Sequence, residues 1–121
     1  MGEGTALIPA DPYDRARMFE WLFWEQYSHE PYIAVIRFQR ALAGKSADQI
    51  EPRLVERGHA ALARMEAGLA GRDWLAGEAA SLADLALVAY TRVAHEGDFD
   101  LSAYPAVRAW VGRTETAFGI A

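Results

Sequence analysis

The chain has 121 residues, of which 52% are hydrophobic and 24% charged, a composition typical of one globular domain and unlike that of a disordered polypeptide. Its formal net charge of −5 argues against nucleic acid or an anionic membrane surface as a partner. The absence of cysteine excludes disulfide bonds, a thiol nucleophile and thiolate metal ligands within this sequence.

Five helices are predicted in chain order, and no strand-type alternation of useful length interrupts them. Asp11-Pro12 supplies an N-cap and a first-turn proline for a helix over about 12–29, which should break near Pro31. A second helical pattern begins at Ile33 and ends at Gly44. The remaining helices are expected from Ser46 to Gly71, over 82–96, and from Tyr104 to Phe118.

The fourth helix carries the clearest local motif. Ser81-Leu82-Ala83-Asp84 fits a capping box, in which the Ser81 hydroxyl accepts from the Asp84 amide and the Asp84 carboxylate accepts from the Ser81 amide. The residues that follow, 85–90, are apolar on every side, which predicts a central helix buried among the others. We interpret Asp84 as a cap; the alternative is a catalytic acid.

The first helix is unusually rich in large apolar side chains. Those between Met18 and Trp24 cover an arc of roughly 260° of the helix surface, whereas a helix at the edge of a core needs about 100°. Because the fourth helix already fills the centre, we expect part of this aromatic belt to contact another domain, a second subunit or a ligand. The alternative is a wide core face with a few exposed aromatic rings.

Two segments resemble soluble glutathione transferases. Residues 71–77, Gly-Arg-Asp-Trp-Leu-Ala-Gly, and 81–87, Ser-Leu-Ala-Asp-Leu-Ala-Leu, look like the loop and the N-capped central helix of that family's C-terminal domain. Further similar segments occur in the expected order along nearly the whole chain: Leu7–Pro12, Glu20-Trp21-Leu22, Phe99-Asp100-Leu101, Tyr104–Val107 and Trp110. The resemblance implies an all-α fold, a bundle of five or six helices with the buried, N-capped central helix at about 81–96.

In that family a thioredoxin-like N-terminal domain binds glutathione and activates its thiol, while the helical domain shapes a hydrophobic substrate site. The resemblance places residues 1–11 in the remnant of an interdomain linker and residues 12–121 in the helical domain. We therefore expect this chain alone to bind no cofactor and to have little or no conjugating activity. Glutathione becomes a co-substrate where a thioredoxin-like domain is joined to it. A homodimer and hydrophobic small-molecule ligands are also implied.

The resemblance also suggests substrate-pocket residues on the first and central helices, none of them catalytic. These candidates are Phe23, Tyr27, His29, Glu30, Tyr90 and Val93. The phenylalanine and the valine could instead be plain packing residues. The two tyrosines could be core residues whose hydroxyls bond to the backbone.

Other signals favour no additional chemistry. The three histidines, His29, His59 and His95, lack the spacing of a metal site, so no metal is expected. The sequence shows no secretory signal and no membrane-spanning segment, which predicts a cytoplasmic protein. Two functions remain: the substrate-binding and dimerising half of a transferase, or a free-standing helical module for protein assembly. A concave pocket at the aromatic belt favours the first, and a flat self-complementary patch the second.

Overall fold

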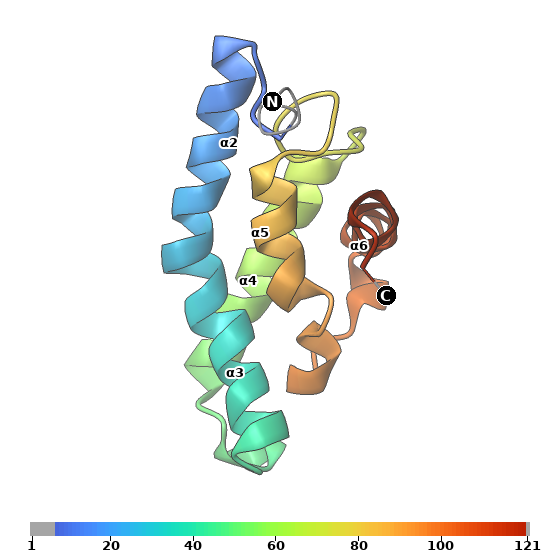
Figure 1. Cartoon of the computed structure of the whole chain (residues 1–121). Helices are drawn as coiled ribbons and strands as arrows, with labels where there is room; N and C mark the ends of the chain where they lie inside the picture. The colour runs from blue at the N-terminus through green and yellow to red at the C-terminus, as the bar shows by residue number, and fades with distance from the viewer. Residues whose placement is uncertain (1–6, 121) are drawn as a thin grey trace.

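The computed structural model describes residues 7–120, in which every regular element is a helix (Figure 1). A long rod consists of α2 (Pro12–Trp24), η1 (Glu25–Ala34), α3 (Val35–Arg37) and η2 (Phe38–Leu42). The other α-helices are α4 (Pro52–Leu69), α5 (Leu82–Thr91) and α6 (Pro105–Phe118). Short 3-10 turns join them: η3 (Ala47–Gln49), η4 (Ala94–Gly97) and η5 (Leu101–Ala103). The prediction of an all-helical bundle is confirmed.

The predicted break near Pro31 is wrong, because the rod continues through it in a wider helical form. Residues Glu25–Ala34 and Phe38–Leu42 are π-helical. Their hydrogen bonds reach back five residues, as from the Ala43 amide to the Phe38 carbonyl at 2.9 Å. In an α-helix a proline ring clashes with the carbonyl four residues earlier and leaves that carbonyl without a donor. A wider turn relieves the clash, so a proline inside the π segment need not end the helix.

The wider turn also determines which side chains the rod buries. Trp21, Glu25, His29 and Ile33 are all buried, at intervals of four residues. In a regular α-helix this spacing would drift by about 40° at each step, whereas turns widened toward the π form hold it on one face. Two ionisable side chains, Glu25 and His29, therefore occupy core positions between apolar ones.

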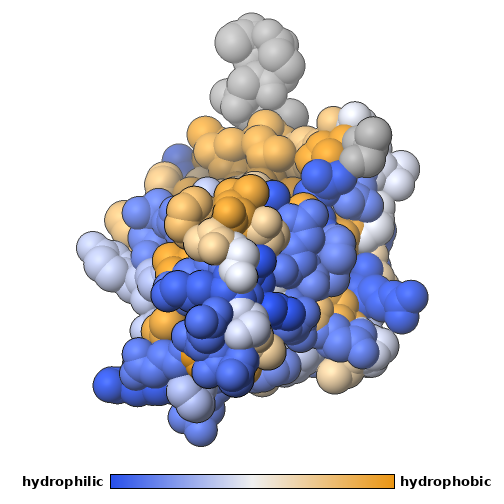
Figure 2. All heavy atoms as spheres, turned by 90° about the horizontal axis from the view of Figure 1, so that it is seen from below, coloured by the Kyte–Doolittle hydropathy of each residue, from blue (hydrophilic) through white to orange (hydrophobic). Residues whose placement is uncertain are grey.

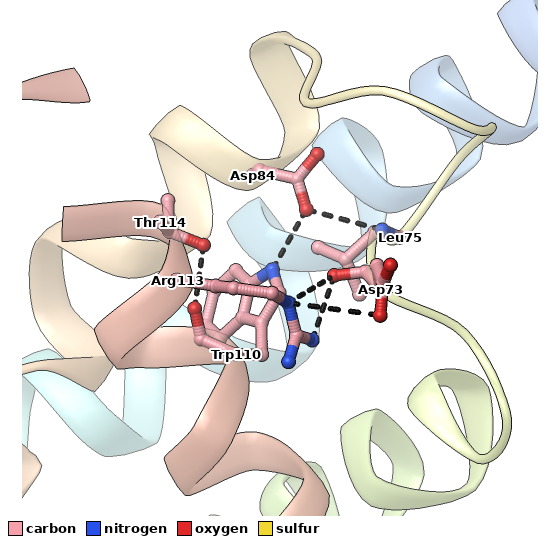
Figure 3. Close-up of polar contacts among 6 residues, drawn as sticks. All are labelled: Asp73, Leu75, Asp84, Trp110, Arg113 and Thr114. Carbon is pink, nitrogen blue, oxygen red and sulfur yellow. Dashed lines mark hydrogen bonds and ion pairs between the residues drawn. The ribbon is translucent and has the colours of Figure 1, made fainter. Parts of the chain in front are cut away.

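α5 packs between the rod and α6, and the predicted capping box is present at its start (Figure 1). The Ser81 amide donates to Asp84 Oδ2 at 2.9 Å. The other oxygen of the same carboxylate, Oδ1, accepts from the Leu75 amide at 3.0 Å and from the indole Nε1 of Trp110 at 2.7 Å (Figure 3). Asp84 is fully buried, so its carboxylate joins the loop before α5, the start of α5 and the middle of α6.

The central helix is shorter and less enclosed than predicted. Its α-helical part ends at Thr91, and the chain continues as the 3-10 turn η4 to a left-handed residue, Asp98, with φ 70°. Leu85 and Ala89 are exposed, so α5 is buried on one face and open on the other. No element of residues 7–120 covers this open face.

Other helix boundaries follow the turn residues. Gly44 and Gly71 both have φ of 72°, in the left-handed region that suits glycine after a helix C-terminus. α4 begins later than predicted, because Ser46 caps the 3-10 turn η3 and extended backbone at Ile50 separates that turn from Pro52. No helix within residues 7–120 combines the length and the hydropathy needed to cross a bilayer.

Candidate functional site

The rod leaves a stripe of apolar side chains uncovered. Phe19, Phe23 and Tyr27 are 46%, 65% and 77% exposed, and they follow one another at intervals of four residues. Toward the end of the rod, three more exposed apolar side chains are Val35, Phe38 and Leu42. In the view from below, hydrophobic residues gather over one half of the surface and the other half is mostly hydrophilic (Figure 2). The described residues therefore do not bury the whole aromatic belt.

A groove of about 450 Å³ lies beside this stripe, between the rod and α5. It is lined by Phe19, Leu22, Phe23, Glu25, Gln26, Tyr27 and Ala86. Most of this lining is apolar or aromatic, and Glu25 supplies its only carboxylate. A concave, mostly apolar surface with a few polar groups is the usual form of a small-molecule site.

Glu25 is the first member of a buried polar chain. Its Oε2 lies 3.4 Å from His29 Nδ1, and His29 Nε2 lies 2.8 Å from Thr91 Oγ1 in α5. The Thr91 hydroxyl in turn donates to the Leu87 carbonyl at 2.7 Å. His29 and Thr91 have no exposed surface, and Glu25 is 6% exposed. The chain thus runs from the floor of the groove into the middle of α5.

A second groove, of about 390 Å³, lies between η1 and α4. Its lining combines aromatic rings with two arginines: Trp24, Tyr27, Ser28, Tyr32, Arg57, Ala60, Ala61 and Arg64. The Arg64 guanidinium lies 4.6 Å from the ring centroid of Trp21, as in a cation–π contact. Tyr27 lines both grooves, the apolar one beside α5 and the one that contains two arginines.

The family model of the C-terminal domain of glutathione S-transferase matches residues 22–116 of the chain. The chain belongs to this family. The glutathione S-transferase of Xanthobacter autotrophicus Py2 is 52% identical, with a TM-score of 0.85, and the match covers 94% of this chain and 57% of that one. The glutathione S-transferase of Pseudomonas fluorescens Pf-5 is 45% identical, with a TM-score of 0.87, over 95% of this chain and 58% of that one.

A third relative is also about twice as long as this chain. Glutathione S-transferase D6 of Drosophila melanogaster is 29% identical over 109 residues, which are 90% of this chain and 49% of that protein. This glutathione S-transferase C-terminal domain therefore spans about half the length of the relatives it matches. The fold expected from the resemblance is confirmed.

The domain brings together only some of the residues suggested as pocket candidates. Phe23 and Tyr27 line the apolar groove, whereas the partly buried Glu30, Tyr90 and Val93 do not. His29 has no exposed surface and reaches the groove only through Glu25. Glu25 was not among the candidates. Its interval of four residues from Trp21 and His29 places it on the buried face only because the helix is widened there, which the sequence alone does not show.

In residues 7–120 of this glutathione S-transferase domain, the groups with a shifted pKa lie outside both grooves. The backbone amide of Ser102 lowers the pKa of Asp100, and the Ser46 hydroxyl lowers the pKa of Asp48. Burial raises the pKa of the Tyr104 hydroxyl. Within the same residues no group of three His, Asp or Glu side chains lies close enough to hold a metal ion. None of these shifts marks an acid or a base in the apolar groove.

Proposed function

We propose that this domain binds apolar small molecules in the groove between α2 and α5, beside a thioredoxin-like domain that binds glutathione. The observation that carries the proposal is the line of exposed aromatic rings, Phe19, Phe23 and Tyr27, along this groove. Apolar surface left in water costs about 25 cal/mol per Å². A ligand in the groove and a partner domain over the stripe would each remove part of that cost.

In this proposal glutathione binds to the thioredoxin-like domain and not to this chain. The relatives are named glutathione S-transferases, and this chain spans about half of their length. The polar groups of the apolar groove are a carboxylate, an amide and a phenol, on Glu25, Gln26 and Tyr27. A thiolate needs nearby cations or fixed hydrogen-bond donors, which this set does not concentrate. We therefore expect little or no conjugating activity from this chain alone.

The test compares the chain alone with a fusion that restores a glutathione-binding domain. The fusion places the part of the Pseudomonas fluorescens relative that precedes its match ahead of Leu7. With glutathione and an aryl halide, we expect no saturable conjugation by the chain of residues 1–121 and measurable conjugation by the fusion. Robust conjugation by the chain alone, or an inactive but folded fusion, would contradict the proposal.

A second candidate function is a helical module for protein assembly, including a homodimer. The observation that favours it is a second set of exposed apolar side chains toward the end of the rod, Val35, Phe38 and Leu42, which do not line the apolar groove. Light scattering of the chain and of a Phe38→Ser variant distinguishes the two. A concentration-dependent dimer that the substitution dissociates supports assembly through this end of the rod, and an unchanged mass for both proteins opposes it.

A further inference from the structure

We infer that the apolar groove selects ligands that carry a hydrogen-bond donor, because Glu25 presents an acceptor to the groove from an almost fully buried position. The inference rests on the proposed function and names the chemical class of the ligand. A carboxylate in a mostly apolar groove is costly unless its oxygens are bonded. The hydrogen-bond partners of its two oxygens therefore decide what the groove can accept.

The positions of the protons follow from the buried chain. The single Thr91 hydroxyl hydrogen is donated to the Leu87 carbonyl at 2.7 Å, so Thr91 Oγ1 can only accept from His29 Nε2. His29 Nε2 therefore carries a hydrogen. Nδ1 faces Glu25 Oε2 at 3.4 Å, and two bare acceptors would repel each other there. One proton consequently lies between Nδ1 and Oε2, on either atom.

Glu25 Oε1 is an acceptor in both arrangements. It is a carboxylate oxygen if His29 holds the proton and a carbonyl oxygen if Glu25 Oε2 holds it. No hydrogen bond to Oε1 is made by residues 7–120. In the same residues Arg17 Nε is the only fully buried side-chain polar atom without a partner, so Oε1 retains contact with solvent. Glu25 is a lining residue of the groove, so we place this solvent contact of Oε1 at the groove surface.

A ligand that fills the groove must replace the water on Oε1. An apolar molecule without a donor removes the water from this oxygen and forms no hydrogen bond in its place, which is unfavourable. A molecule with a hydroxyl, an N–H group or an ammonium can keep the bond while its apolar body covers the aromatic rings. The His29–Thr91 chain holds Glu25 in place, so His29 is a positioning residue.

The test uses a pair of probes that differ in one donor, 2-naphthol and 2-methoxynaphthalene, titrated into the full chain by calorimetry. Although 2-methoxynaphthalene is the more hydrophobic, we expect 2-naphthol to bind about tenfold more tightly, the effect of one hydrogen bond to a poorly solvated acceptor. Equal affinities, or tighter binding of 2-methoxynaphthalene, would overturn the inference and leave an apolar groove. Failure of both probes to bind would overturn the proposed ligand function as well.

Three variants assign the preference to Glu25. Glu25→Met removes both oxygens at similar length and should abolish the preference for 2-naphthol. Glu25→Gln should retain most of it, because the amide can donate to His29 Nδ1 and turn its oxygen to the groove. Gln26→Met is the matched control, since Gln26 also lines the groove and is exposed; the preference should persist. An unchanged preference in a folded Glu25→Met protein would overturn the inference, and the two-probe comparison on the unaltered chain decides it if that variant does not fold.

Discussion

The indole Nε1 of Trp110 donates to Asp84 Oδ1 over 2.7 Å, and this bond ties α6 to the first turn of α5 (Figure 3). The same carboxylate accepts from the Leu75 and Ser81 amides at 3.0 and 2.9 Å. Both Asp84 and Trp110 are fully buried. A helix cap that would otherwise act locally thus also connects the loop before α5 and the middle of α6 to the start of α5.

Replacing Asp84 by Ala should destabilise the fold strongly. The substitution removes the acceptor of three buried N–H donors and of a longer bond from the Ser81 hydroxyl at 3.4 Å, and each buried N–H donor left unbonded costs about 1–3 kcal/mol. We expect the free energy of unfolding in urea to fall by about 3–5 kcal/mol. Ser81→Ala is the control, because it removes only the cap hydroxyl, a loss of about 1 kcal/mol. Equal losses for the two variants would show that the bonds to Leu75 and Trp110 add nothing.

Thr91→Val tests the bond between His29 and α5. Thr91 and Thr114 are both fully buried, and each donates its hydroxyl to the carbonyl four residues earlier at 2.7 Å. Only Thr91 also accepts a hydrogen bond from His29, at 2.8 Å. Thr91→Val should therefore cost about 1–2 kcal/mol more than Thr114→Val in the same unfolding measurement, the penalty for a buried donor left unbonded. Similar costs would mean that the His29 bond does not stabilise the fold.

Two mid-helix glycines should respond in opposite directions to alanine. A Cβ added at Gly58 in α4 would overlap the buried Phe99 ring, with Cε1 only 2.7 Å away, whereas a Cβ at Gly112 in α6 meets nothing within 4 Å. Gly112→Ala should raise the free energy of unfolding by about 0.5–1 kcal/mol through helix propensity alone. Gly58→Ala should lower it by about 1–3 kcal/mol, as overpacking does. Thermal melts of both variants check the signs, and stabilisation by Gly58→Ala would contradict the packing described.

The exposed stripe should bind apolar dyes. Phe23→Ser removes a 65% exposed ring that lines the groove, and Tyr13→Ser removes a 68% exposed ring on the same helix outside it. We expect the enhancement of anilinonaphthalene sulfonate fluorescence to fall several-fold in Phe23→Ser and to change little in Tyr13→Ser. Both side chains are exposed, so neither substitution should shift the unfolding midpoint by much. Equal dye binding by the two variants would show that the dye does not bind at the groove lined by Phe23.

Much of the fold could be predicted because local residues specify it. The proline and the aspartate at 11–12, the capping box at 81–84 and the glycines at 44 and 71 act on their own helix ends, and each appears where expected. Pro31 misled the prediction because the rule for proline assumes hydrogen bonds to the fourth residue, and the rod uses the fifth there. The wider turns are stabilised because they bury side chains at intervals of four residues against the other helices. That burial depends on the whole fold and not on the residues next to Pro31.

The site was less predictable than the helix ends, because part of it depends on contacts between segments that are far apart in the sequence. Phe23 and Tyr27 could be proposed because the family resemblance implies that they lie on the cleft-facing side of the first helix. The excess of large apolar residues on that helix predicts only that part of it stays exposed. Glu25 could not, because a glutamate on a helix is usually solvated, and its burial depends on His29 and on Thr91, far along the chain in α5. Long-range pairs of this kind are not encoded in the spacing of one segment.

The most direct test of the central claim is to locate a bound apolar ligand by amide chemical-shift changes in the full chain titrated with 2-naphthol. We predict saturable shifts that cluster around Phe19, Phe23 and Ala86, on the groove between α2 and α5. Shifts centred on Arg57 and Arg64, in the groove between η1 and α4, or no saturable shifts at all, would contradict it.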